Sequence, residues 1–295
     1  MWQAETFDPV TIDRELGWAA GLGMNVVRVY LHDLAWHKDP AGFRNRVQRF
    51  LSIAARHGIR AIFVLFDDCW NPNPQPGPQP APIPGVHNSR WLQSPGVDVV
   101  NDPSQWGRLE PYVRDVLGTF GKDRRVLLWD LYNEPGNSGQ GARSLPFLRQ
   151  VFEWARQVQP AQPLTAGIWA NLPELNLFQL LNSDVITFHN YDDASSLRRQ
   201  IAELRRHGRP LICTEWMARP ISTIPSHLAV FCENGVGCFL WGLVAGKTQT
   251  IYPWAARSDP HEQGLWFHDL LRPDGTPYDP QEAALLRKLS SRSSK

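Results

Sequence analysis

The chain has 295 residues, 42% of them hydrophobic, which is enough for one large core. Its 30 basic and 29 acidic side chains give a formal net charge of +1, so charge offers no basis for binding nucleic acid or an anionic membrane. No apolar stretch is long enough to span a bilayer and no secretory leader is visible, so we expect a soluble protein, either cytoplasmic or secreted with its leader absent.

Helical patterns recur along the chain from its N-terminus. Asp8-Pro9 and Asp39-Pro40 each place an N-cap before a proline, and the apolar periodicity that follows ends near Gly23 and Gly58. Further helices are expected at about residues 146–158, 194–207, 225–234 and 280–290, and a weaker pattern covers 105–121.

Short apolar runs alternate with these helices. They cover residues 25–31, 59–66, 126–132, 164–169, 184–191, 210–216 and 235–244. The runs are nearly continuous, as in strands that are buried on both faces of a parallel sheet. Repeated strand–helix alternation over this length predicts an α/β fold, a (β/α)₈ TIM barrel that forms a single catalytic domain over residues 1–295.

The first strand of this barrel is expected to be abbreviated or missing, because only Met1 to Thr6 precede the first helix. A missing strand would leave exposed edges, so residues 1–4 or a neighbouring chain should partly fill the gap. A homo-oligomer through the barrel edge near the N-terminus is the corresponding partner prediction. No glycine-rich phosphate loop follows the first predicted strand, which counts against a dinucleotide-binding fold.

Polar and aromatic side chains gather at the carboxyl ends of the predicted strands, where barrels of this type carry their catalytic groups. These ends read Asp67-Asp68, Asn133-Glu134, His189-Asn190-Tyr191, Thr214-Glu215-Trp216 and Trp241. The opposite ends of the predicted strands carry no comparable group of polar and aromatic side chains. This polarity predicts a site at one end of the sheet.

Two glutamates in this set are expected to differ in charge. Arg28 lies inside a Val-Val-Arg-Val strand, and a buried guanidinium needs a carboxylate, for which Glu215 is the natural partner. Arg28 would keep Glu215 ionised, whereas Glu134 has no such cation and would hold its proton. A charged nucleophile and a neutral general acid are what glycoside hydrolysis requires.

With these residues the sequence resembles clan A of the glycoside hydrolases, the (β/α)₈ retaining enzymes that include the family 5 cellulases and mannanases. The resemblance rests on WDLYNEP around Glu134 and LICTEW around Glu215, and it extends from Arg28 through His189-x-Tyr191 to Trp241. It implies a retaining glycoside hydrolase for β-linked oligo- or polysaccharides, with Glu134 as acid/base, Glu215 as nucleophile and no metal or organic cofactor.

The same resemblance implies contacts with the sugar or with the nucleophile, namely Asn133 at the sugar 2-hydroxyl, Arg28 and Tyr191 against Glu215, His189 along the site, and Trp241 beneath the reacting sugar. The chain departs from the family pattern at Asp67-Asp68-Cys69-Trp70, where typical family 5 members carry a histidine. Asp67 and Asp68 either bind sugar hydroxyls or cap a turn.

Two loops are candidate walls of a sugar cleft. Residues 71–91 carry proline at every second position from 72 to 84, which favours a stiff, extended path flanked by Trp70 and Trp91. Residues 244–254 offer Lys247, Gln249 and Trp254 as contacts. An inert surface loop is the alternative for 71–91. Two tryptophan-rich loops favour endo action on a mannan, glucan or xylan backbone.

Other interpretations use the same residues. Glu134 could cap the loop at 136–139 while Glu215 only pairs with Arg28, and the barrel could be a carbohydrate-binding pseudoenzyme. A barrel aldolase lacks a suitable lysine on an inner strand face, since Lys247 lies beyond its strand. The four cysteines lack metal-site spacing, and three of them lie in or beside apolar runs, so buried thiols are expected.

Overall fold

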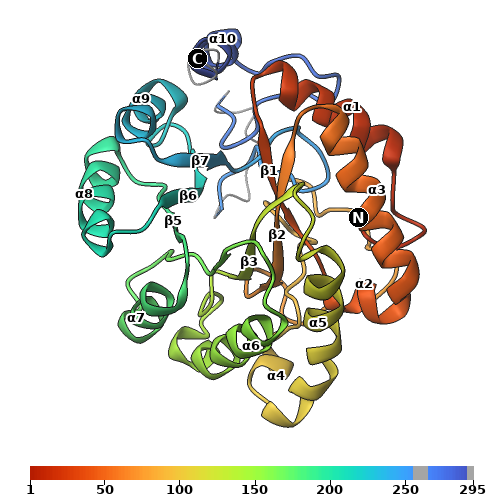
Figure 1. Ribbon diagram of the computed structural model, residues 1–295. Helices are drawn as coiled ribbons and strands as arrows, with labels where there is room; N and C mark the ends of the chain where they lie inside the picture. The colour runs from red at the N-terminus through yellow and green to blue at the C-terminus, as the bar shows by residue number, and fades with distance from the viewer. Residues whose placement is uncertain (255–264, 291–295) are drawn as a thin grey trace. The chain divides into compact units, whose positions relative to one another are not determined.

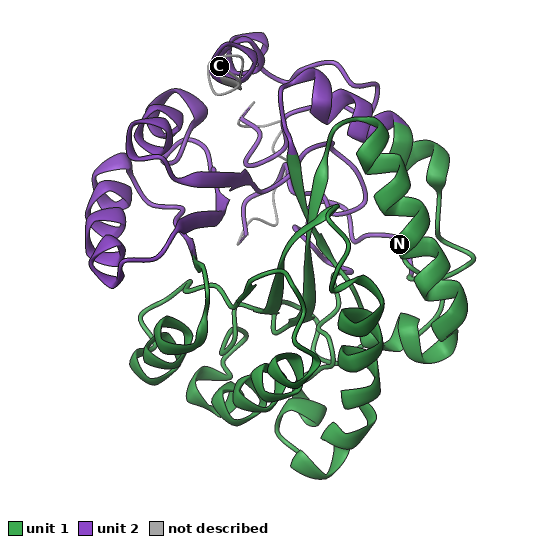
Figure 2. Ribbon diagram, in the orientation of Figure 1, with its two compact units in different colours: residues 1–13, 26–79, 91–186 green, residues 14–25, 80–90, 187–295 purple. Residues whose placement is uncertain are grey.

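The computed structural model describes residues 1–254 and 265–290, and the chain forms two compact units (Figure 2). Unit 1 comprises residues 1–13, 26–79 and 91–186, and unit 2 comprises residues 14–25, 80–90 and 187–295. Helix α1, Pro9–Gly21, contributes residues to both.

Unit 1 is built on a four-stranded parallel sheet in the order β1-β2-β3-β4 (Figure 1). Its strands are β1 Val26–Tyr30, β2 Arg60–Asp67, β3 Val126–Asn133 and β4 Leu164–Thr165. The register pairs Asp67 at the end of β2 with Asn133 at the end of β3. The polar ends of these two strands are therefore neighbours.

Helices follow the strands of unit 1 along the chain, and side chains from both helices and strands form its core. Their bounds are α2 Asp33–Lys38, α3 Pro40–Arg56, α4 Val97–Val100, η1 Pro103–Arg108, α5 Glu110–Phe120, η2 Gly141–Ser144, α6 Leu145–Val158 and α7 Pro173–Asn182. Helix α3 packs on β2, and α6 packs on β3. Strand β2 is buried from Ala61 to Asp67, as its continuous apolar run predicted.

Unit 2 contains a three-stranded sheet in the order β5-β6-β7. Its strands are β5 Ile186–His189, β6 Leu211–Trp216 and β7 Gly237–Leu240, and Ile186 itself falls in unit 1. Its helices are α8 Ala194–Leu204, η3 Arg205–His207, α9 Ile224–Asn234 and α10 Pro280–Ser290. Strands β6 and β7 are parallel, and α9 packs against β7.

All seven predicted strands are confirmed, although three of them, β4, β5 and β7, are at most half as long as expected. The run at 164–169 forms a strand only over Leu164–Thr165, because side chains bind the backbone beyond it: Ala166 N donates to Ser183 Oγ, and Gly167 O accepts from Gln179. Strand β7 ends before Gly242, whose φ of +87° is incompatible with a continuing strand.

The predicted helices are confirmed, but three α-helices were not predicted: α2, α4 and α7. Helix α7 buries Leu175 and Phe178, while Leu177 and Leu181 are 59% and 72% exposed. Apolar residues on the exposed face blur the helical period on which the prediction depends. No described helix is long and apolar enough to cross a membrane.

The N-terminal segment is packed rather than paired. Residues 1–4 form no strand, yet Trp2 is only 3% exposed, and its indole donates to Tyr30 O over 2.6 Å. Its ring also packs against Phe43, Phe50 and Phe63. The segment therefore contributes a core side chain to unit 1, while an oligomer through this edge stays a prediction.

The expectation of buried thiols holds for two of the four cysteines. Cys69 and Cys213 are buried, Cys238 is half-buried, and Cys232 is exposed. Cys232 lies on the solvent-exposed side of α9, so its apolar neighbours in the sequence do not lead to its burial. The prediction of a single catalytic domain over 1–295 remains a prediction.

Candidate active site

The turn after β3 presents Glu134 in unit 1. Strand β3 ends at Asn133, and Glu134 then adopts a φ of +44°, which is uncommon for a residue with a side chain and costs about 1–2 kcal/mol. Gly136 continues the turn with a φ of +90°, and a Cβ there would lie 2.8 Å from Gly141 O. The Pro-Gly pair therefore allows the chain to turn sharply at the carboxylate.

Asp68 holds this turn in place. Its side chain is fully buried and accepts hydrogen bonds from Gly136 N at 2.8 Å, Tyr132 Oη at 2.5 Å and Ser144 Oγ at 2.5 Å. Burial raises the pKa of Asp68 to about 6, although all three donors oppose the rise. Of the two roles considered from sequence, the contacts of Asp68 are those of a turn anchor.

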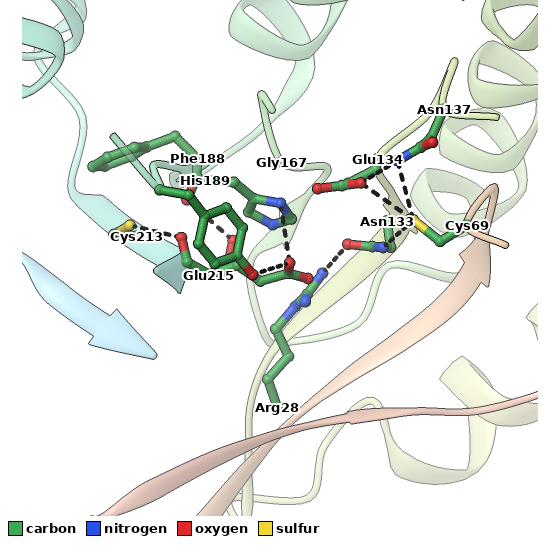
Figure 3. A network of polar contacts seen from close by, with 12 residues as sticks. Arg28, Cys69, Asn133, Glu134, Asn137, Gly167, Phe188, His189, Cys213 and Glu215 are labelled. Atoms are coloured by element: carbon green, nitrogen blue, oxygen red, sulfur yellow. Dashed lines mark hydrogen bonds and ion pairs between the residues drawn. The ribbon is translucent and has the colours of Figure 1, made fainter. Parts of the chain in front are cut away.

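The Glu134 carboxylate receives two donors inside unit 1 (Figure 3). Cys69 Sγ donates to Glu134 Oε2 over 3.2 Å, and Asn137 Nδ2 donates to the same oxygen. Glu134 is 9% exposed, so its carboxylate lies mostly out of solvent. Both donors were missed in the sequence analysis; Asn137 lies three residues after the glutamate, within reach of its side chain.

Arg28 has a buried partner that the sequence analysis also missed. Its Nε and Nη2 donate to Asp130 Oδ2 over 3.0 and 2.7 Å, and Nη2 also donates to Asn133 Oδ1 over 2.7 Å. Asp130 is fully buried within β3. An aspartate inside an apolar strand needs a cation, and that signal was available in the sequence. The expected pair of Arg28 with Glu215 stays a prediction.

Asp67 lies beside Asn133 and is held by three donors. Its side chain accepts from Asn133 Nδ2 at 2.9 Å, Trp91 Nε1 at 2.6 Å and Cys69 N at 3.0 Å. Burial raises the pKa of Asp67 to about 7, more than these donors lower it. Trp91, at the end of the proline-rich segment, is thus tied to the polar strand ends, whereas Trp70 is 36% exposed.

In unit 2, Glu215 lies near the end of β6 and is anchored through both its backbone and its carboxylate. Tyr191 Oη donates to Glu215 Oε2 over 2.9 Å. His189 Nδ1 lies 3.6 Å from the same oxygen (Figure 3). Asn190 N and Cys213 Sγ donate to Glu215 O. Glu215 is 6% exposed. The predicted His189, Tyr191 and Glu215 therefore form one cluster.

An aromatic group supports Tyr191. The Tyr191 ring lies 4.9 Å from Trp254 and 5.6 Å from His268, between ring centroids. Burial lowers the pKa of His268 to about 3, so its imidazole is neutral, and its Nδ1 donates to Met217 O. His268 lies outside the predicted strand ends, so no sequence pattern pointed to it. Trp254 is 45% exposed.

Trp241 and the loop after it complete the predicted set in unit 2. Trp241 follows β7, is half-buried, and its N donates to Trp216 O over 3.1 Å. Gln249 binds the segment 80–90: its Oε1 accepts from Gly85 N, and its Nε2 donates to Ile83 O and Val86 O. Hydrogen bonds of Asn88 N to Thr248 O and of His87 to Tyr252 O extend this contact.

Residues 16–245 match the family described as Cellulase (glycosyl hydrolase family 5). The chain belongs to glycosyl hydrolase family 5. Family membership supports glycoside hydrolase activity, as the motifs around Glu134 and Glu215 implied. No curated protein sequence matches this family 5 chain significantly.

Solved structures share the fold of this family 5 protein at low identity. A subfamily 18 member of glycoside hydrolase family 5 from Streptomyces cattleya, in complex with Manβ1-4GlcNAc, matches with a TM-score of 0.66 at 12% identity, over 97% of this chain and 76% of that chain. The endo-1,4-β-mannanase of Rhizomucor miehei matches with a TM-score of 0.64 at 14% identity, over 100% and 94%.

A third structure, the exo-β-1,4-mannosidase Op5Man5 from Opitutaceae bacterium strain TAV5, matches with a TM-score of 0.65 at 18% identity, over 99% of this chain and 57% of that chain. Together with the family match, these structures confirm the expected fold class, an α/β fold of the (β/α)₈ barrel type with a short strand count.

Proposed function

We propose that this family 5 protein is a retaining β-glycosidase in which Glu134 is the acid/base and Glu215 the nucleophile. The observation that supports this assignment is the setting of each glutamate at the carboxyl end of its strand. Glu134 accepts from a thiol and an amide, and Glu215 accepts from a tyrosine hydroxyl. Positioned donors of this kind orient a carboxylate for chemistry.

The reaction proceeds in two steps. Glu134 donates its proton to the leaving glycosidic oxygen while Glu215 attacks the anomeric carbon, which forms a glycosyl-enzyme. Glu134, now ionised, takes a proton from water, and that water releases the sugar with its original anomeric configuration. The mechanism requires the two carboxyl groups to lie about 5–5.5 Å apart at one sugar.

The other predicted residues serve binding in this proposal. Asn133 meets the sugar 2-hydroxyl, Trp241 lies beneath the reacting sugar, and Trp70 and Asp67 border the cleft. Arg28 and His189 hold the polar strand ends in place. No metal or organic cofactor takes part in the two-carboxylate reaction.

The substrate we propose is a β-linked glycan, with endo action preferred. The three structural neighbours described above carry names that refer to β-mannosides: an endo-1,4-β-mannanase, an exo-β-1,4-mannosidase and a complex with Manβ1-4GlcNAc. β-Mannosides and β-mannans therefore come first in a substrate panel, ahead of glucans and xylans.

The test is a panel of nitrophenyl β-glycosides and β-glycans, with the anomers of the first product followed by NMR. We expect hydrolysis with retention, and a loss of about 10³-fold or more in kcat for Glu215→Gln. An inverted product would exclude the covalent route. Oligosaccharide binding without turnover across the panel would instead identify a carbohydrate-binding pseudoenzyme.

A further inference from the structure

A cysteine thiol lies against the carboxylate of Glu134. Cys69 follows Asp67-Asp68 at the end of β2, where the chain departs from the residues typical of its family. Its side chain is buried, with the residue 8% exposed, and Sγ donates to Glu134 Oε2 over 3.2 Å (Figure 3). The contact joins the ends of β2 and β3 within one sheet.

The position and the donor direction of this thiol are set by its neighbours. Cys69 N donates to Asp67 Oδ1 over 3.0 Å, which fixes the backbone. The Nδ2 atoms of Asn133 and Asn137 each lie 3.4 Å from Sγ and donate to it. Two amides occupy the acceptor side of the sulfur, so its own hydrogen is available to a carboxylate. The thiol faces two of them, Glu134 Oε2 and the side chain of Asp67.

We propose that Cys69 is a positioning residue for Glu134. The hydrogen bond that its thiol donates orients the Glu134 carboxylate and favours the ionised form of that carboxylate. This inference rests on the proposed function, in which Glu134 must hold a proton in the first step and be ionised in the second. A hydrogen bond to the charged form favours that form. The thiol therefore helps to set the pH at which the acid/base residue exchanges its proton.

The pH profile separates this role from simple packing. In a retaining enzyme the basic limb of kcat/KM reports the loss of the general-acid proton. When the thiol is removed, the carboxylate loses a donor to its charged form, so the proton is held more firmly and the limb moves to higher pH. A residue that only fills space would change the stability of the fold and leave the limb where it is.

The experiment compares Cys69→Ala, Cys69→Val and Cys69→Ser by kcat/KM against pH on the best nitrophenyl glycoside. We expect the two variants without a donor to shift the basic limb upward by roughly half a pH unit or more, because the ionised carboxylate loses one of the hydrogen bonds that favour it. Serine keeps a hydroxyl donor and should return the limb to the wild-type position. Valine fills the space if alanine fails to fold.

The controls use thiols that do not contact Glu134. Cys232→Ala, on the exposed surface, and Cys238→Ala, half-buried, should keep the wild-type profile. An unshifted limb in both Cys69→Ala and Cys69→Val would overturn the inference. Glu134→Ala separates the two claims: if it stays fully active, the proposed function fails, whereas if it is inactive and the Cys69 limbs are unshifted, only the role of Cys69 fails.

Discussion

The guanidinium of Arg28 on β1 donates twice to Asp130 Oδ2 on β3, across the intervening strand β2. The Arg28 side chain is 4% exposed and that of Asp130 is fully buried. This ion pair links the first and third strands of the sheet below the polar ends that carry Asn133 and Glu134. It stabilises the part of unit 1 from which Glu134 projects.

Removal of Asp130 should therefore cost stability. We expect Asp130→Ala to lower the free energy of unfolding by about 3–5 kcal/mol, because a buried guanidinium loses the carboxylate that accepts two of its hydrogen bonds. Urea unfolding followed by tryptophan fluorescence measures this change. Glu233→Ala, which removes the exposed partner of Arg198, is the control and should cost less than about 1 kcal/mol. A loss that small for Asp130→Ala would contradict the structural importance of the pair.

The Asp67 carboxyl should make stability fall as pH rises. Burial raises its pKa from 3.8 to about 7, so between these values the folded state binds more protons than the unfolded state. Its stabilising contribution is full below about pH 3.8 and is lost as the pH approaches 7. Asp67→Asn keeps the side-chain shape without the titration and should flatten this part of the curve.

Unfolding free energies at pH 4, 5.5 and 7 would check this prediction, since those values bracket the titration of Asp67. Asp274→Asn provides the comparison: the pKa of exposed Asp274 is lowered by its hydrogen bond to Thr276, so its small effect has the opposite sign. Parallel curves for wild type and Asp67→Asn would show that Asp67 is ionised throughout.

Tyr191→Phe should weaken catalysis without unfolding the protein. The variant removes the hydroxyl that donates to Glu215 Oε2 over 2.9 Å and keeps the ring that packs on Trp254 and His268. We expect kcat/KM to fall by about 10–100-fold and its acidic limb to move to higher pH, because Glu215, the nucleophile of the proposed mechanism, loses a donor to its ionised form. Tyr252→Phe is the control. A wild-type acidic limb in Tyr191→Phe would argue against Glu215 as the ionised group.

Gln249→Ala should release the segment 80–90 from the loop 244–254. Gln249 makes three side-chain hydrogen bonds to that segment, so we expect faster proteolytic cleavage within 80–90. If these loops border a cleft for several sugars, activity on a β-glycan should fall several-fold more than activity on a nitrophenyl glycoside. Gln79→Ala, in the preceding part of the proline-rich segment, is the matched control. An equal loss of activity on the β-glycan and on the nitrophenyl glycoside would show that these loops do not border the cleft.

Neighbouring residues predicted a helix or strand well where they carried one strong pattern, such as an N-cap followed by proline or a continuous apolar run. Asp39-Pro40 gives an N-cap and a proline at the start of α3, and the Asp39 side chain accepts from Gly42 N as that pattern requires. Strand β3 and its polar end were also predicted correctly. A continuous apolar run that ends in Asn-Glu-Pro-Gly is typical of a buried strand followed by a turn. Helix α7 was missed because its exposed leucines obscure the period.

The partners of the site residues depended on tertiary structure. Cys69 and Glu134 are 65 positions apart, and Arg28 and Asp130 are 102 apart. Such pairs form because the parallel register brings the ends of β2 and β3 together, and no local pattern contains that register.

The sequence alone therefore determined the strand–helix alternation and the family motifs, and it pointed to the two glutamates proposed as catalytic groups, because each of these signals lies in neighbouring residues. Only the tertiary structure decided which donors surround Glu134, that Asp130 pairs with Arg28, and that burial raises the pKa of Asp67 to about 7. Desolvation and side-chain geometry arise when distant segments pack, so they cannot be assigned before the fold is known.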